Sequence, residues 1–233
     1  MANEVKRIPY KGVRKIIGDT LHNSLMNAPH ATIMTSVDMT NYDELKKKMK
    51  NSGTSLSGTA FFIKATGLAL KEFPQFNARL VPAENGNGEE IVFYDDADAG
   101  IAVDTPRGLM MITVRDCANR SVKDLTDDIR DKAYRMRNGG IRYSETIGST
   151  FTISNEMMST NDFFNSIINN NETFILGIPR YKKMPVVDEN DRIVVRQMGN
   201  IILTYNHKMV DGMPAAAFLG KIAEYMEDPE SIL

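Results

Sequence analysis

The chain has 233 residues, 42% of them apolar and 25% charged, and its 28 Lys and Arg nearly balance its 30 Asp and Glu. A near-neutral charge excludes a broad nucleic-acid-binding surface, and a single cysteine, Cys117, excludes disulfide scaffolds, iron–sulfur clusters and zinc fingers. The opening residues lack the apolar core of a signal peptide and no apolar run is long enough to span a bilayer, so we expect a soluble cytoplasmic protein without membrane or nucleic-acid partners.

Helical and extended patterns alternate irregularly along the chain. In chain order they predict a helix at 13–26, a strand at 31–39, helices at 41–49 and 57–73, strands at 91–94, 100–103 and 110–114, a helix at 121–137, strands at 150–154, 174–178, 193–197 and 201–205, and a helix at 212–226. Asn41 and Ser121 are placed to cap their helices, and 187–191 has the composition of a hairpin turn. Helices cluster early and strands late, which favours a single α+β domain with a large mixed β-sheet over a regular βαβ repeat.

One segment has the residue types and spacing that suit chemistry. The apolar strand 201–205 runs into Asn206 and His207, and Asp211-Gly212 opens a helix four residues later. A strand end followed by a tight turn fixes an imidazole as a general base requires, and a helix N-terminus favours the Asp211 carboxylate. An isolated His-x-x-x-Asp more often only hydrogen-bonds its own turn, so spacing alone leaves both interpretations open.

The stretch from His207 to Gly212 resembles the His-x-x-x-Asp-Gly motif of the dihydrolipoamide acyltransferase catalytic domains and of chloramphenicol acetyltransferase. Similar blocks follow the family's order along almost the whole chain, at 14–17, 28–32, 37–40, 73–78, 100–109, 150–155 and 175–178. The resemblance implies the chloramphenicol acetyltransferase-like fold, a two-layer α+β sandwich with a large mixed sheet. It also implies one catalytic domain over residues 1–233, with no lipoyl or subunit-binding domain among them.

The resemblance further implies an acyl transfer between coenzyme A and the thiol of dihydrolipoamide or of a lipoyl carrier. His207 takes the place of the general base, Ser154 that of the oxyanion donor, and Asp211 that of the carboxylate paired with an arginine of the first helix, here Arg14. Asn206 stands where the family usually has Asp, and we expect it to support the site. The plainer alternatives are helix capping for Asp211 and an ordinary strand hydroxyl for Ser154.

Family members are homotrimers whose active site lies between subunits, and in some of them the C-terminal residues join trimers into a larger cubic core. The resemblance therefore implies a homotrimer, and as partners a lipoyl carrier or the other components of a dehydrogenase complex. Asp131-Lys132-Ala133 is similar to the tripeptide around a lipoyl-lysine, but it falls inside a predicted helix and we interpret it as a chance match.

Several departures from the family keep two other functions open. Lys208 replaces the usual Arg after the histidine, and 156–161 replaces a Gly-rich segment after Ser154. These changes leave as alternatives an O- or N-acetyltransferase acting on a small molecule, or a catalytically weakened scaffold or assembly protein.

Overall fold

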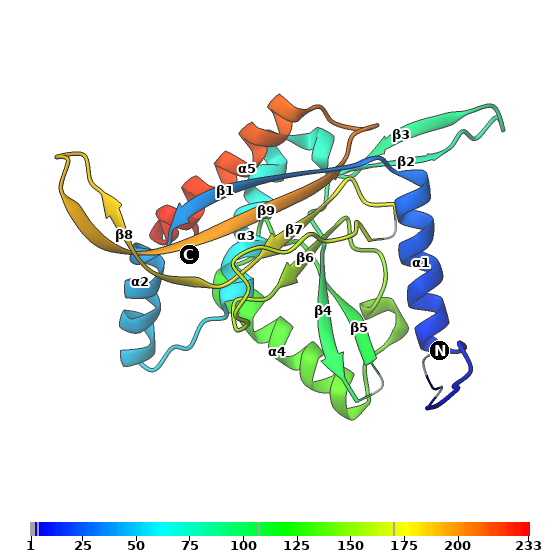
Figure 1. The fold of residues 1–233 in the computed structure, drawn as a ribbon, viewed down its shortest axis with the longest axis horizontal. Helices are drawn as coiled ribbons and strands as arrows, with labels where there is room; N and C mark the ends of the chain where they lie inside the picture. The colour runs from blue at the N-terminus through cyan, green and yellow to red at the C-terminus, as the bar shows by residue number, and fades with distance from the viewer. Residues whose placement is uncertain (1–2, 4, 107, 170) are drawn as a thin grey trace.

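The computed structural model describes residues 3, 5–106, 108–169 and 171–233. Its helices are α1 (Val13–Asn27), α2 (Thr40–Asn51), α3 (Gly58–Glu72), α4 (Val122–Asn138) and α5 (Gly212–Glu227), with the short 3₁₀ turns η1 (Pro74–Phe76), η2 (Tyr143–Glu145) and η3 (Pro229–Ile232). Its strands are β1 (His30–Asp38), β2 (Ala78–Pro82), β3 (Glu89–Phe93), β4 (Ala99–Thr105), β5 (Gly108–Val114), β6 (Phe151–Asn155), β7 (Phe174–Ile178), β8 (Tyr181–Val187) and β9 (Ile193–Asn206) (Figure 1).

The central sheet has the strand order β1-β9-β7-β6-β4-β5, with β8 pairing to the first half of β9. The pairs β4–β6 and β6–β7 are parallel and the others are antiparallel, so the sheet is mixed as expected. Two register pairs matter for the site: Ser154 lies opposite Gly177, and Phe174 opposite Tyr205. Ser154 therefore ends β6 at one end of the sheet, whereas β9 ends at the other.

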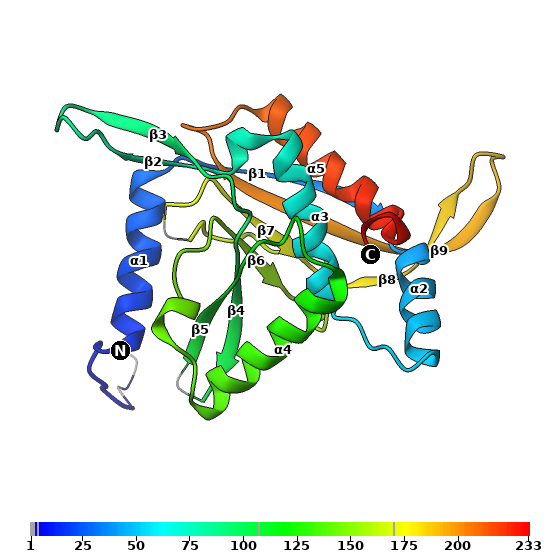
Figure 2. The same ribbon diagram turned by 180° about the vertical axis from the view of Figure 1, so that it is seen from behind.

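A layer of three helices covers one face of the sheet (Figure 2). Helix α5 packs on β1 and β9, α4 packs on β4 and β5, and α3 lies between these two helices. Buried phenylalanines fill the space beneath α5: Phe76 stacks on Phe218 with ring centroids 4.2 Å apart, and Phe151 stacks on Phe174 at 5.7 Å. Aromatic burial of this kind stabilises a core strongly, and it confirms the predicted two-layer α+β arrangement.

Helix α1 and two hairpins stand away from this core (Figures 1 and 2). The β2–β3 hairpin forms a separate two-stranded sheet, and all of β3 is exposed, including Ile91, Val92 and Phe93. The β8–β9 hairpin extends from the opposite end of the sheet, as the turn predicted at 187–191 requires. No helix in the described part of the chain is long and apolar enough to cross a membrane.

Two local predictions were wrong. Asn41 does not cap α2, because the helix begins at Thr40 and the Asn41 side chain instead donates to the backbone oxygen of Glu227, at 2.8 Å. The predicted strands 193–197 and 201–205 are one strand, since β9 continues its pairing with β1 through Gly199. A Cβ at Gly199 would lie 2.9 Å from the Cβ of Tyr181, so this glycine makes room for β8 rather than breaking the strand.

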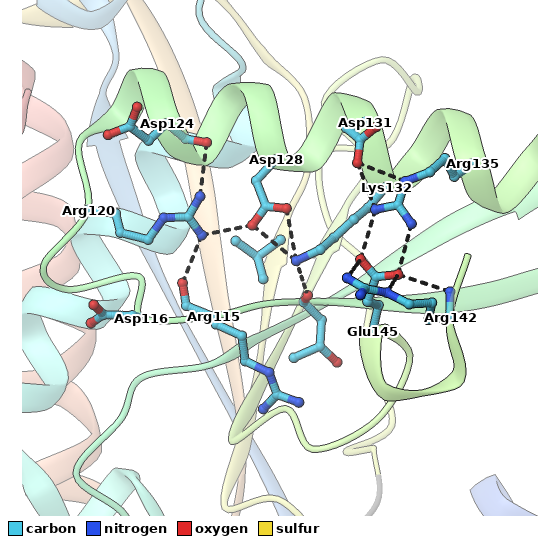
Figure 3. A network of polar contacts seen from close by, with 12 residues as sticks. Arg115, Asp116, Arg120, Asp124, Asp128, Asp131, Lys132, Arg135, Arg142 and Glu145 are labelled. Atoms are coloured by element: carbon cyan, nitrogen blue, oxygen red, sulfur yellow. Dashed lines mark hydrogen bonds and ion pairs between the residues drawn. The ribbon is translucent and has the colours of Figure 1, made fainter. Parts of the chain in front are cut away.

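A polar network ties α4 to the sheet and to η2 (Figure 3). The buried Lys132 ammonium donates to the backbone oxygen of Thr113 at 2.8 Å and pairs with Asp128 at 2.9 Å. Hydrogen bonds from Arg135, and then from Arg142, hold the pKa of Glu145 well below its usual range. Since Lys132 is buried in a helix and paired, the tripeptide 131–133 is a chance match and not a carrier site.

Candidate active site

The His207 turn consists of residues 206–211, between β9 and α5, and is held by hydrogen bonds to Asn206 and by backbone bonds to two neighbouring segments. The Asn206 side-chain oxygen accepts from the backbone N–H of Lys208 at 3.0 Å, and its backbone oxygen accepts from Met209 and Val210 at 2.9 and 3.2 Å. The His207 N–H donates to the backbone oxygen of Pro29 at 2.9 Å. Asn206, which is 7% exposed, thus sets the conformation of the turn that carries His207, as a side-chain-to-backbone turn does.

The His207 imidazole faces solvent on one side and Asp211 on the other. Its Nδ1 lies 3.7 Å from Asp211 Oδ1, and the two side chains are 45% and 89% exposed. Asp211 occupies the N-cap position of α5, but its side chain makes no capping hydrogen bond. The Asp211 side chain therefore does not cap the helix, and the imidazole of His207 is its ion-pair partner within the described residues.

Arg14 lies far from this pair within one chain. It is exposed in the first turn of α1, and the His207 turn is bonded to Pro29 beyond the other end of that helix. A rise of about 1.5 Å per residue puts the Arg14 backbone roughly 20 Å from that end. Within the described residues no ion pair joins Arg14 to Asp211, whose one ion-pair partner there is His207.

Ser154 opens onto an apolar cavity of about 530 Å³ on the face of the sheet toward α1. The walls come from α1, β4, β5, β6, β7 and the segment 164–169, and include Ile17, Leu21, Met111 and Phe164. Ser154 is half-buried, and its hydroxyl makes no hydrogen bond within the described residues. The cavity is large and apolar enough for a slender organic chain, with a hydroxyl donor at its wall.

The structure does not bring His207 and Ser154 together in one chain. Ser154 pairs with Gly177, Gly177 pairs with Ile202, and His207 lies five residues further along and beyond β9. Strands about 4.8 Å apart with a rise of about 3.3 Å per residue place the Ser154 and His207 backbones roughly 20 Å apart. A reaction that uses both side chains at one substrate atom needs two copies of the chain.

The other residues of interest have structural surroundings. His22 is exposed on α1, and burial lowers the pKa of His30, whose Nε2 lies 3.5 Å from the Ser24 hydroxyl. Burial raises the pKa of the Cys117 thiol to about 12, so this cysteine is not a thiolate nucleophile near neutral pH. No group of three or more His, Cys, Asp or Glu within the described residues could hold a metal ion.

Sequence reasoning missed Glu172. Its side chain is completely enclosed, and the Ser149 hydroxyl donates to its Oε1 at 2.7 Å. The available signal was an acidic residue two positions before a fully buried strand, because an acid so close to an apolar strand needs a special environment. Glu172 lies beside the base of the His207 turn, because the next residue, Thr173, accepts the Asn206 N–H through its backbone oxygen.

Comparison with known proteins identifies the relatives of the chain. The family model of the 2-oxoacid dehydrogenases acyltransferase (catalytic domain) matches residues 2–233. The lipoamide acyltransferase component of the branched-chain alpha-keto acid dehydrogenase complex of Bacillus subtilis is 34% identical over 95% of this chain and 52% of its own length. The chain spans about half the length of the curated relatives it matches.

Solved structures of the same family have a similar fold. The dihydrolipoamide acetyltransferase of Azotobacter vinelandii, studied for the catalytic roles of a serine, a histidine and an asparagine, superposes with a TM-score of 0.89 and 27% identity, covering 98% of this chain and 94% of its own. The cubic core of the pyruvate dehydrogenase multienzyme complex gives the same values. Chloramphenicol acetyltransferase has a TM-score of 0.55 and 18% identity over 89% of this chain and 94% of its own, which confirms the predicted fold.

Proposed function

Because the chain belongs to the family of 2-oxoacid dehydrogenase acyltransferase catalytic domains, we propose that it transfers an acyl group between coenzyme A and the thiol of dihydrolipoamide. In this proposal residues 1–233 form one catalytic domain, acyl-coenzyme A is a substrate, and the lipoyl group belongs to a carrier protein in the cytoplasm. The match over nearly the entire chain, with His207 exposed on a rigid turn, is the observation that carries the proposal.

His207 acts as the general base. Its Nδ1 faces Asp211, so Nε2 takes the proton of the attacking thiol while the sulfur bonds to the thioester carbonyl carbon. The carbon–sulfur bond to the leaving group then breaks, and the proton on Nε2 passes to the departing thiolate. A positioned imidazole contributes about 10²–10⁴-fold to the rate of such a step.

Ser154 stabilises the tetrahedral intermediate. The carbonyl oxygen becomes an oxyanion when the thiol adds, and a donor already in place lowers the energy of that charge without reorganisation. The Ser154 hydroxyl makes no other hydrogen bond within the described residues and lies at the wall of the apolar cavity, which we assign to the acyl-thioester end of the substrate.

Three further residues support the pair. Asn206 fixes the turn, and Asp211 orients the imidazole. The histidine and asparagine studied in the Azotobacter acetyltransferase are four residues apart, as His207 and Asp211 are, which supports a role for this second position. Arg14 supports the site from α1 in this proposal, through contacts that one chain alone does not make.

The assembly follows from the separation of the two groups. His207 of one subunit must meet Ser154 of a neighbouring subunit, and a closed ring of three copies repeats that contact three times. We propose a homotrimer, which the similarity to a pyruvate dehydrogenase cubic core extends to a larger cage, with a lipoyl carrier and dehydrogenase complex components as partners.

The test is an acyl transfer assay on the intact protein. Acetyl-, isobutyryl- and succinyl-coenzyme A are each mixed with free dihydrolipoamide, and release of coenzyme A is followed. We expect His207→Ala to lower kcat by about 10²–10⁴-fold and Ser154→Ala by about 10²–10³-fold. His22→Ala, which removes an exposed imidazole from α1, is the matched control and should leave kcat unchanged.

Other outcomes would point to the other functions. Equal rates for wild type, His207→Ala and Ser154→Ala contradict the catalytic assignment and favour a scaffold. Turnover with small hydroxyl or amine acceptors but not with dihydrolipoamide favours a small-molecule acetyltransferase.

A further inference from the structure

We propose that Glu172 is a positioning residue that joins the two separated parts of the active site, and that it does so as an uncharged carboxylic acid. The inference rests on the proposed acyl transfer, because it concerns the placement of Ser154 and His207 for that reaction. The contacts on either side of Glu172 carry it.

On one side, the Glu172 carboxyl is connected to Ser154 through contacts with β6. The Ser149 hydroxyl donates to Oε1 at 2.7 Å, and the Thr152 hydroxyl is a second hydrogen-bonding group beside the carboxyl. Thr152 and Ser154 lie two residues apart on β6, so their side chains leave the same face of the strand, and both line the apolar cavity. A shift of Glu172 therefore moves the strand segment that presents the Ser154 hydroxyl.

The other side of Glu172 leads to His207. The neighbouring Thr173 accepts the Asn206 N–H through its backbone oxygen at 2.8 Å, and its hydroxyl donates to the backbone oxygen of Ala78 at 2.5 Å. Asn206 is the residue that fixes the His207 turn. Glu172 and Thr173 thus connect β6 to the base of that turn through successive residues.

The enclosure of Glu172 favours its neutral form, because burial away from water penalises the charged carboxylate. The side chain is fully enclosed, and its Oε2 has no hydrogen-bond partner within the described residues. Burial outweighs three groups that lower the pKa of Glu172: the Ser149 and Thr152 hydroxyls and the charge of Arg79 on β2. The Arg79 guanidinium donates to the backbone oxygen of Ser149 rather than to Glu172. On the β4 side, Asp98 is paired with Arg115 at 2.5 Å.

Packing at Gly100 preserves this arrangement. A Cβ there would lie 2.9 Å from the Thr152 hydroxyl oxygen and 3.0 Å from that of Ser149. Only glycine leaves room for both hydroxyls to face the carboxyl. Burial raises the pKa of Glu172 to about 7, which agrees with a group that is largely protonated in mildly acidic solution.

The experiment compares the pH dependence of kcat in wild type, Glu172→Gln and Glu172→Ala, each as the intact assembly. Glutamine has the shape of the neutral acid and cannot ionise. We expect Glu172→Gln to match wild type within about twofold at pH 6, and the wild-type to Gln ratio of kcat to fall as the pH rises through 7. Titration of His207 and of the thiol cancels in this ratio.

Glu172→Ala removes the connection altogether, and we expect kcat to fall about tenfold or more at every pH, with recovery in Glu172→Gln. Sedimentation and circular dichroism check that each variant folds and assembles. A ratio that stays constant with pH overturns the neutral-acid role, and a Glu172→Gln protein that folds but is as slow as Glu172→Ala overturns the positioning role. If wild type does not catalyse acyl transfer, both the proposed function and this inference are wrong. If wild type is active but either of the two contrary results is found, only this inference is wrong.

Discussion

The two ends of the central sheet hold their chemical groups in different ways. At the β9 end, His207 lies on a short turn held by hydrogen bonds from Asn206 to the next residues and by backbone bonds to Pro29 and Thr173, and its side chain is 45% exposed. At the β6 end, Ser154 lines an apolar cavity assembled from six separate parts of the chain. The contacts at the β9 end are therefore mostly short-range and the side chain there is open to solvent, whereas the contacts at the β6 end come from distant parts of the chain and enclose a cavity.

The two ends should therefore respond differently to substitutions elsewhere in the fold. A turn held mainly by short-range hydrogen bonds depends on few other parts of the fold, but it offers no wall to a substrate. A cavity built from many elements provides walls, yet it responds to any change in their packing. A composite site made from two subunits combines an exposed base from one with an enclosed pocket from the other.

The largest expected effect comes from mixing two variants, one without the base at the β9 end and one without the hydroxyl at the β6 end. His207→Ala and Ser154→Ala subunits, each nearly inactive alone, are unfolded together in equal amounts and refolded. If the site lies between subunits, random assembly leaves about one quarter of the sites with both groups, and the mixture regains that share of wild-type kcat. Recovery is measured with the same coenzyme A release assay.

The matched control mixes each variant with itself through the same unfolding and refolding cycle. A mixture of the two variants that is no more active than these controls would place both groups in one chain. That result would require His207 or Ser154 to move roughly 20 Å relative to the arrangement described.

The next largest effect concerns the stability of the fold around Glu172, beside the base of the His207 turn. The pKa of Glu172 is raised from 4.5 to about 7 by burial, so the folded protein binds a proton that the unfolded chain releases. Its favourable contribution is complete below pH 4.5 and is lost as the pH rises to 7, a loss of about 3 kcal/mol. Glu172→Gln should therefore gain stability relative to wild type over this range, measured by urea unfolding at one protomer concentration.

A weaker effect is expected at the His207 turn itself. Asn206→Ala removes the side-chain oxygen that accepts from Lys208, and we expect a loss of about 1 kcal/mol of stability and about a tenfold lower kcat. Asn206→Asp keeps an acceptor at the same place and should retain most of the activity. Equal kcat values for wild type and Asn206→Ala would show that the turn does not need this hydrogen bond.

The same contrast explains what the sequence could predict. The His207 turn was predictable because most of its hydrogen bonds join Asn206 to the residues that follow it, although its bond to Pro29 was not predicted. The α4 cap was confirmed because Ser121 accepts from the Asp124 N–H three residues away. Family resemblance supplied Ser154, whose cavity depends on distant elements. Glu172 was missed because its enclosure beside Ser149 is a tertiary property, and the acidic residue before a buried strand is only an indirect sign of it.

The two wrong predictions of secondary structure also arose from contacts between distant parts of the chain. The sequence predicted two strands at 193–197 and 201–205, but Gly199 between them accommodates Tyr181 from β8 and the strand continues. Asn41 has a strong capping preference, yet α2 starts one residue earlier and the side chain reaches Glu227 near the C-terminus. In both cases a long-range contact overrode a local preference.

The smallest effect is expected for Asp211, the group that links the His207 imidazole to the start of α5. The two side chains lie 3.7 Å apart, and the carboxylate is 89% exposed, so water and salt screen most of its charge. Asp211→Asn keeps an oxygen near Nδ1 and should lower kcat by no more than about fivefold in the isolated geometry. A much larger loss would mean that Asp211 becomes buried when subunits assemble, and the salt dependence of kcat distinguishes the two cases, because a buried pair is insensitive to ionic strength. That measurement therefore reports whether the open end of the sheet remains open in the working assembly.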